Sequence, residues 1–284
     1  MLGAEFLSLV PPNQAAPVRK EVDLSLQTTI AIMRVLVLVI ATKSALCQMH
    51  TEYWQRVLKS CPPEVDVRFI HADPSLAEPI SAAEASCVPR EVVVKTRECF
   101  VPGIFIKTMK SMEHLIGAPE PAQEDEREQE SERKYDWVLR TNTSTFIHFP
   151  SLLKLLPTLD PSAYHGSMIK RAPRFAQQRF AVGFFILFST EVARKLLDEY
   201  SRGAGVNISR LPDDVALAKL AEQSGLVFKS LSQQTVLPHM FHKHLLRPRS
   251  NIIAIRNRNY EPIPVRLVAE RKRWEHIVSL YSIE

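Results

Sequence analysis

Glycine is scarce in this chain: its 284 residues include only eight glycines, against 20 prolines. The spacing of those glycines spells neither the G-x-G-x-x-G dinucleotide fingerprint nor the G-x-x-x-x-G-K-[ST] phosphate loop. Both signatures need glycine where the backbone must approach a phosphate closely. A phosphate-bearing ligand would therefore be held by other groups.

Long apolar runs and paired cysteines are missing as well. The most apolar stretch, residues 28–42, contains Arg34 and is shorter than the roughly 20 residues of a membrane-spanning helix, so we expect no membrane span. No C-x-x-C pair is present, which excludes a zinc finger. We expect the four cysteines to be buried thiols: Cys47, Cys61, Cys87 and Cys99.

Charge gives no strong preference for one class of partner. The chain is 45% hydrophobic and 24% charged, with a net charge of +5, which is typical of a globular protein that favours anionic ligands. The basic residues that follow Arg247 are not interleaved with aromatics and form no nucleic-acid-binding motif. We read them as solvated surface and expect no nucleic-acid partner. A basic nucleic-acid binder is a distant third hypothesis.

Strand-like and helix-like segments alternate along the chain, which indicates an α/β fold with a mostly parallel central sheet flanked by helices. We expect a flexible leader at 1–32, then a single domain at 33–284 that contains a disordered acidic loop at 119–134. The expected strands are 35–42, 65–73, 91–96, a strand within 135–149 and 180–189. The expected helices are 50–61, 103–117, 149–159, 189–200, 213–225 and 269–281.

Three clusters could carry chemistry. Asp213 and Asp214 open a helix; one acid is enough to favour the positive end of the dipole, so the other is a candidate catalytic carboxylate. The stretch HMFHKH (239–244) could hold a metal, or its histidines could simply be exposed or packed. The polar stretch RTNTS (140–144) follows a strand, where a ligand could bind, although a plain turn explains it equally well.

Taken in order, these segments resemble the fringe-type β-1,3-glycosyltransferases, a family with the GT-A nucleotide-sugar fold. The resemblance runs from about residue 34 to 245 and depends on several motifs in sequence. They are VLVLVIATKS (35–44), VRFIHAD (67–73), IKTMKSMEHL (106–115), YDWVLRTNTSTFIHFPSLLKLLPTLDPSAYHGS (135–167), VGFFILFSTEVARKLL (182–197), RLPDDVALAKL (210–220) and FHKHL (241–245).

The resemblance implies transfer of a sugar, with inversion, from a nucleotide-sugar (a UDP-sugar) to a carbohydrate hydroxyl of a glycan or glycoprotein. Asp214 or Asp213 would be the general base. Gly183 would lie on the acceptor side, and His244 would be a metal ligand. The donor would be bound by Thr42, Lys43, Asp73, Lys107, Arg140, Asn142 and Ser144.

One departure from the family concerns its cofactor. The family holds a divalent cation, Mn²⁺ or Mg²⁺, against the donor diphosphate with an Asp-x-Asp motif. The corresponding stretch here, within Arg140 to Ser144, has no carboxylate, and amides and hydroxyls are poorer ligands for such ions. Arginines could neutralise the diphosphate instead.

This departure leaves a second hypothesis open: a catalytically inactive GT-A scaffold that binds a nucleotide or glycan without turnover. It also bears on location. The family usually resides in the Golgi lumen behind a membrane anchor; we expect no such anchor here, and residues 1–32 do not have the pattern of a secretory signal. We therefore expect a cytoplasmic protein, with the Golgi lumen as the alternative.

Overall fold

The computed structural model describes residues 32–77, 80–82, 91–117, 135–168, 180–204, 208–236, 251–258 and 261–283. The chain divides into two units, 1–32 and 33–284, and everything below concerns the second. Several expectations lie outside the described residues: the leader apart from Ile32, the acidic loop at 119–134, Cys87, and the histidine stretch with His244. No helix within the described segments is long and apolar enough to cross a membrane.

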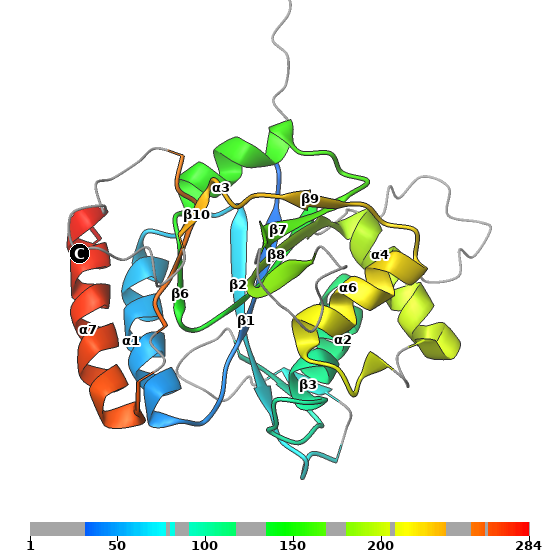
Figure 1. The fold of residues 1–284 in the computed structure, drawn as a ribbon, viewed down its shortest axis with the longest axis horizontal. Coiled ribbons are helices and arrows are strands. Elements are labelled where there is room, and N and C mark those ends of the chain that lie inside the picture. The colour runs from blue at the N-terminus through cyan, green and yellow to red at the C-terminus, as the bar shows by residue number, and fades with distance from the viewer. Residues whose placement is uncertain are drawn as a thin grey trace, which may run out of the picture. The chain divides into compact units, whose positions relative to one another are not determined.

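The core of the fold is an eight-stranded, mostly parallel sheet with the strand order β3-β4-β2-β1-β5-β8-β7-β9 (Figure 1). Strands β1, β2, β4 and β5 run parallel, whereas β3 and β8 are antiparallel to their neighbours. The strands are β1 Val35–Ile40, β2 Val65–Ala72, β3 Ile80–Ala82, β4 Glu91–Val94, β5 Trp137–Asn142, β7 Tyr164–Met168, β8 Ala181–Ser189 and β9 Phe228–Ser230.

Helices cover both faces of this sheet, which explains why the central strands are apolar on both sides. In β1, Val35, Val37 and Val39 pack against one layer, and the alternate residues pack against the other. The first layer contains α1 Ala45–Lys59, α3 Phe149–Leu155 and α7 Ile263–Leu280; the second contains α2 Gly103–Ile116, α4 Thr190–Glu199 and α6 Asp213–Gln223 (Figure 1).

A smaller three-stranded sheet connects the main sheet to the C-terminal segment. Its order is β10-β11-β6, formed by Thr235–Val236, Ala254–Arg256 and Thr145–Ile147. Strand β6 follows β5 after a two-residue turn, and β11 pairs with it antiparallel. The turn after β5 is therefore tied to the segment that leads into α7.

Most expected elements are confirmed, and the differences have local causes. Helix α1 begins at Ala45 rather than 50 because the Ser44 hydroxyl caps it by accepting the Cys47 N–H. Helix α7 begins at Ile263, six residues before the expected start, directly after Pro262. The expectation of buried cysteines is wrong for Cys61 and Cys99, which are half-buried; Cys47 is buried.

The N-cap of α4 gives a stability prediction. The Ser189 hydroxyl accepts the Val192 N–H (3.1 Å) and donates to the Pro161 carbonyl (2.7 Å). We expect Ser189→Ala to lower the free energy of unfolding by about 1 kcal/mol, because it removes an N-cap. Urea titration measures the change. Ser201→Ala is the matched control, since Ser201 is exposed; equal effects of the two substitutions would contradict the prediction.

Candidate functional site

The order of the strands identifies where a ligand would bind. The chain runs outward from β1 through β2 to β4, then returns to place β5 on the other side of β1. In open α/β sheets, ligands bind outside the carboxyl ends of the strands at such a reversal. Here that point lies between residues Ala41–Ser44, after β1, and Thr143–Ser144, after β5, because Ile40 and Asn142 are register partners.

Neutral side chains form the turn after β5. The Asn142 Oδ1 accepts hydrogen bonds from the hydroxyls of Ser144 and Thr145, both at 2.9 Å. The backbone of the turn is held as well: the Trp54 indole donates to the Thr143 carbonyl (2.9 Å), and the Asn257 N–H donates to the Ser144 carbonyl (2.7 Å). This turn (residues 142–145) is therefore rigidly placed, and none of its side chains is a carboxylate.

A buried ion pair lies on the helix α6 side of β5. The Arg140 guanidinium contacts the Asp213 carboxylate through Nη2, and the two residues are only 2% and 6% exposed. Helix α6 starts at Asp213, and Pro212 at its N-cap position makes no side-chain cap. Asp213 pairs with Arg140. Nε and Nη1 of Arg140 are buried and have no hydrogen-bond partner within the described part of the chain.

Gly183 packs directly against this pair. A Cβ at position 183 would lie 2.9 Å from Nη1 of Arg140 and 3.1 Å from Oδ2 of Asp213, so a larger residue would displace the pair. The Gly183 N–H instead donates weakly to Oδ2 of Asp214 (3.4 Å). The structure thus brings together four of the predicted site residues, Arg140, Gly183, Asp213 and Asp214.

The two aspartates have different environments. Asp214 makes no ion pair among the described residues; its Oδ1 accepts the Val215 N–H at 3.0 Å. Burial, and then the charge of Asp213, raise the pKa of Asp214 above its usual range, and Arg140 opposes this shift only in part. A carboxylate with a raised pKa in a site of this kind is suited to accept a proton.

Lys107 is fully buried on the same side of the sheet. Its Nζ donates to the Ala41 carbonyl at the end of β1 and to Oε1 of Glu98, each at 2.8 Å. Burial lowers its pKa, although Glu98 opposes the shift. In this arrangement Lys107 holds the carboxyl end of β1 against α2, and its charge is balanced by Glu98.

Thr42, Lys43 and Asp73 lie at the ends of β1 and β2. The Thr42 N–H donates to the Cys47 sulfur (3.1 Å), and its hydroxyl contacts the Ser44 hydroxyl (3.0 Å). Asp73 accepts hydrogen bonds from the N–H and hydroxyl of Ser75, and these bonds, together with the charge of Lys43, lower its pKa. Asp73 therefore stabilises its own turn in addition to lying at the strand end.

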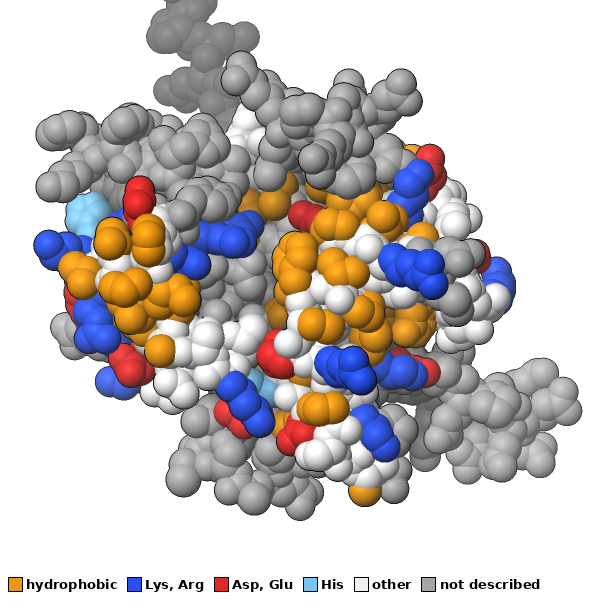
Figure 2. All heavy atoms as spheres, turned by 60° about the horizontal axis from the view of Figure 1, so that its bottom comes forward, with side chains coloured by type: hydrophobic (Ala, Val, Ile, Leu, Met, Phe, Trp, Pro, Cys, Tyr) orange, Lys and Arg blue, Asp and Glu red, His pale blue; other side chains and the backbone are white. Residues whose placement is uncertain are grey.

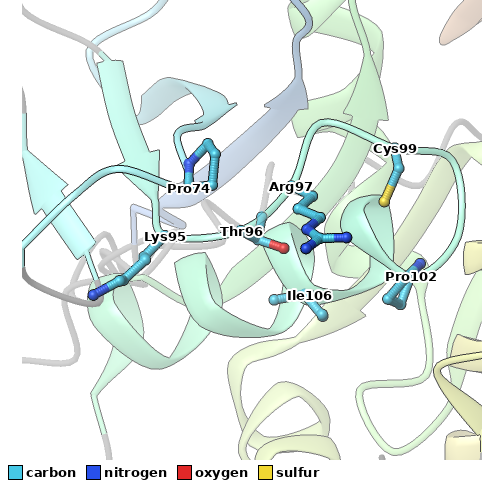
Figure 3. A pocket seen from close by; sticks show the side chains of 7 residues that line it. All are labelled: Pro74, Lys95, Thr96, Arg97, Cys99, Pro102 and Ile106. Atoms are coloured by element: carbon cyan, nitrogen blue, oxygen red, sulfur yellow. The ribbon is translucent and has the colours of Figure 1, made fainter.

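A pocket of about 320 Å³ lies next to Asp73, beyond the ends of β2 and β4 (Figure 3). Figure 3 shows Arg97 and Thr96 on the side of Ile106, whereas Lys95 turns away, as its hydrogen bond to the Ala77 carbonyl (3.1 Å) requires. The lining residues are Pro74, Lys95, Thr96, Arg97, Cys99, Pro102 and Ile106. The mixture of apolar and cationic groups suits a flat, partly polar ligand.

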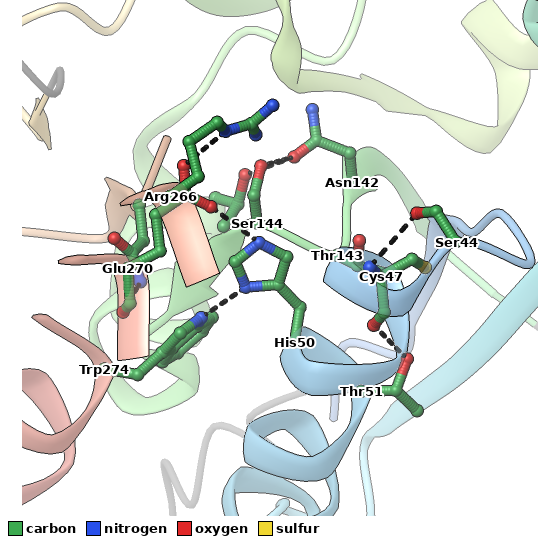
Figure 4. Close-up of polar contacts among 12 residues, drawn as sticks. Ser44, Cys47, His50, Thr51, Asn142, Thr143, Ser144, Arg266, Glu270 and Trp274 are labelled. Atoms are coloured by element: carbon green, nitrogen blue, oxygen red, sulfur yellow. Dashed lines mark hydrogen bonds and ion pairs between the residues drawn. The ribbon is translucent and has the colours of Figure 1, made fainter. Parts of the chain in front are cut away.

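A buried polar network beside the turn was not predicted from the sequence (Figure 4). The Trp274 indole donates to Nδ1 of His50 (2.6 Å), so the imidazole proton is on Nε2, which donates to Oε2 of the fully buried Glu270 (3.0 Å). Oε1 of Glu270 accepts Nε of Arg266 (3.0 Å). The i, i+4 spacing of Arg266, Glu270 and Trp274 was visible in the sequence, but the expected helix began at 269 and omitted Arg266.

Among the residues that the structure describes, the groups near the strand ends do not match a hard divalent cation. No group of three or more His, Cys, Asp or Glu side chains comes together among the residues that the structure describes. The turn at 142–145 offers only amide and hydroxyl groups, and of the adjacent acids Asp213 and Asp214 the first is paired with Arg140. His244 lies outside the described residues.

Comparisons with known proteins give distant structural likenesses only. No protein-family model matches the chain, and no curated protein matches it. It is similar to the galactosyltransferase LgtC, solved with donor and acceptor sugar analogs: 11% identity, 86% of this chain and 95% of that chain covered, TM-score 0.45. It is also similar to the apo form of the glycosyltransferase GlyE of Streptococcus pneumoniae: 11% identity, 89% and 64% covered, TM-score 0.45. The chain thus spans somewhat under two thirds of the GlyE chain.

The raised pKa of Asp214 leads to a prediction about pH. Its neutral form is favoured in the folded state, so its contribution to stability is present below the unfolded-state pKa and is lost as the pH rises through the folded-state pKa. We therefore expect Asp214→Asn to gain stability relative to the unsubstituted protein as the pH is raised from about 4 to 7. Urea titrations at several pH values measure this difference.

Asp198→Asn is the matched control, because Asp198 is exposed on α4. A flat difference for Asp214→Asn, or the same slope for both variants, would contradict the assignment of a desolvated carboxylate at 214.

Proposed function

We propose that this protein is a glycosyltransferase that moves a sugar from a nucleotide-sugar to a carbohydrate hydroxyl, with Asp214 as the general base. One observation carries the proposal: the two adjacent acids at the start of α6 have different partners. Asp213 is paired with the buried Arg140, whereas Asp214 makes no ion pair among the described residues. A desolvated carboxylate at the carboxyl edge of a parallel sheet is placed to take a proton from a bound ligand.

The proposed reaction is a single displacement. The Asp214 carboxylate accepts the proton of the acceptor hydroxyl, and the acceptor oxygen forms a bond to the anomeric carbon of the donor sugar. The bond between that carbon and the diphosphate oxygen breaks, so the nucleoside diphosphate leaves with the bonding electron pair. Attack opposite the leaving group inverts the anomeric centre. No step is assigned to a divalent cation, because the turn at 142–145 has no carboxylate to bind one.

The finer assignments rest on the sequence motifs. The Leu-Pro-Asp-Asp segment at 211–214 and the strands before it support a fringe-type enzyme and a UDP-sugar donor. In this proposal the nucleoside lies near Asp73 and the pocket lined by Thr96 and Arg97, and the acceptor, a glycan or glycoprotein, approaches from the side of Gly183.

A non-catalytic scaffold that binds a nucleotide or glycan is the second candidate. The observation that favours it is the same turn, whose neutral side chains do not reproduce the family's metal-binding aspartates. Binding without turnover separates this candidate from the enzyme. Figure 2 shows lysine and arginine side chains scattered between hydrophobic ones on the face it displays. We propose no nucleic-acid partner.

Thermal unfolding with a panel of nucleotides and nucleotide-sugars, in Mn²⁺, Mg²⁺ or EDTA, tests the donor. A ligand at 100 times its dissociation constant stabilises the folded state by about 2.7 kcal/mol, which is readily seen as a rise in Tm. We expect UDP and one UDP-sugar to raise Tm equally with EDTA and with Mn²⁺. The absence of any rise across the panel would contradict a nucleotide-sugar donor.

Substitution of each aspartate tests the base. We expect Asp214→Asn to lower kcat by at least about 100-fold while the dissociation constant for UDP changes less than about twofold, since a general base acts mainly in the chemical step. Asp213→Asn should instead lower the free energy of unfolding by about 3 kcal/mol, because it leaves the Arg140 charge buried without its partner. Full activity of Asp214→Asn would eliminate this residue as the base.

A further inference from the structure

The two buried cations of the site described above are already paired with carboxylates. A nucleoside diphosphate brings negative charge to the strand ends, yet the turn at 142–145 offers only neutral groups. Lys107 is held by Glu98 and the Ala41 carbonyl, and Arg140 by Asp213. Both cations are buried and paired with a carboxylate, and the unpartnered Nε and Nη1 of Arg140 are buried as well. Besides the exposed Lys43 at the end of β1, a cation with accessible hydrogen-bond donors would help to neutralise the diphosphate.

Arg266, in the first turn of α7, has such donors. Its Nε donates to Oε1 of Glu270 at 3.0 Å, and both terminal amino groups have no hydrogen-bond partner among the residues that the structure describes. The side chain is 19% exposed, so the guanidinium is fixed at its base and open at its end. Two parallel N–H groups in this geometry match two oxygens of a phosphate.

Arg266 is connected to the turn by an unbroken series of hydrogen bonds. The backbone carbonyl of Glu270 accepts Nδ2 of Asn257 (2.7 Å), and the Asn257 N–H donates to the Ser144 carbonyl (2.7 Å). The Ser144 hydroxyl in turn donates to Asn142. Figure 4 shows the Arg266 guanidinium and the Asn142 amide extending on the same side of this network.

The buried end of this network fixes the side chain of Glu270. Glu270 is fully buried, and a buried ion pair adds little net stability compared with apolar packing. His50, oriented by Trp274, occupies the second oxygen of Glu270, which leaves the first to hold Arg266 in one position. The arrangement therefore fixes an arginine at the ligand-binding edge of the sheet.

We propose that Arg266 binds the diphosphate of the nucleotide donor at the turn formed by residues 142–145, in place of a divalent cation. This inference rests on the proposed function and deepens it, because it names the group that neutralises the leaving diphosphate. Glu270, His50 and Trp274 are positioning residues that act through Arg266.

Calorimetric binding of UDP and of uridine in EDTA tests the proposal, since only UDP carries phosphates. We expect Arg266→Gln to weaken UDP binding about ten- to 100-fold and to change uridine binding less than about twofold, as loss of hydrogen bonds to a charged group predicts. Arg266→Lys keeps the charge without the planar fork, so its affinity for UDP should lie between those of the unsubstituted protein and Arg266→Gln. Arg271→Gln, on the exposed side of the same helix, is the matched control and should bind UDP normally.

Each other outcome overturns a defined claim. Equal loss of UDP and uridine binding in Arg266→Gln would mean a structural role and would overturn the inference. Unchanged UDP binding in that variant, or UDP binding by the unsubstituted protein only with Mn²⁺, would overturn it while leaving a glycosyltransferase possible. Failure of the unsubstituted protein to bind UDP under any condition would remove the proposed UDP donor together with the inference.

Discussion

The buried ion pair between Arg140 and Asp213 is the constraint on which the candidate site depends. A guanidinium that is 2% exposed must have its charge balanced, and Asp213 is the carboxylate that does so. The pair joins the carboxyl-terminal half of β5 to the first residue of α6, and it leaves room above it for glycine alone at position 183. Strand β8, helix α6 and strand β5 are thus held in one relative position at the edge where a ligand would bind.

This pairing also decides how two neighbouring aspartates differ. Adjacent acids in the first turn of a helix would ordinarily be interchangeable, since both lie near the positive end of its dipole. Burial, and then the negative charge of the neighbouring Asp213, raise the pKa of Asp214, and Arg140 opposes this shift only in part. A carboxylate without an ion-pair partner among the described residues is free to accept a proton, whereas one held by a guanidinium is not. The candidate base follows from this asymmetry.

Local sequence patterns predict the elements but not the contacts that make the site. Apolar β-branched residues predict β1, and Gly117 correctly predicts the end of α2, where it adopts a positive φ of 70°. The partnership of Arg140 with Asp213 joins residues 73 positions apart, and that of His50 with Glu270 joins residues 220 positions apart. No periodicity encodes such pairs, because they depend on how the sheet orders its strands. The early start of α7 hid Arg266 for a simpler reason: its first turn has exposed apolar residues rather than a helical pattern.

The smaller sheet makes the turn after β5 and the C-terminal helix parts of one unit. Strand β6 pairs with β11, so the Ser144 carbonyl and the Asn257 N–H that follows β11 are brought together, and Asn257 in turn holds the backbone of α7 at Glu270. A carboxylate-poor turn and a rigidly held arginine are therefore connected by the same hydrogen bonds. An aspartate turn would need a metal ion from solution to meet a diphosphate; in the arrangement proposed above, Arg266 would supply the positive charge and is held in place by Glu270 before a ligand arrives. Preorganised charge of this kind requires no rearrangement when the ligand binds, which is the condition under which electrostatic stabilisation is most effective.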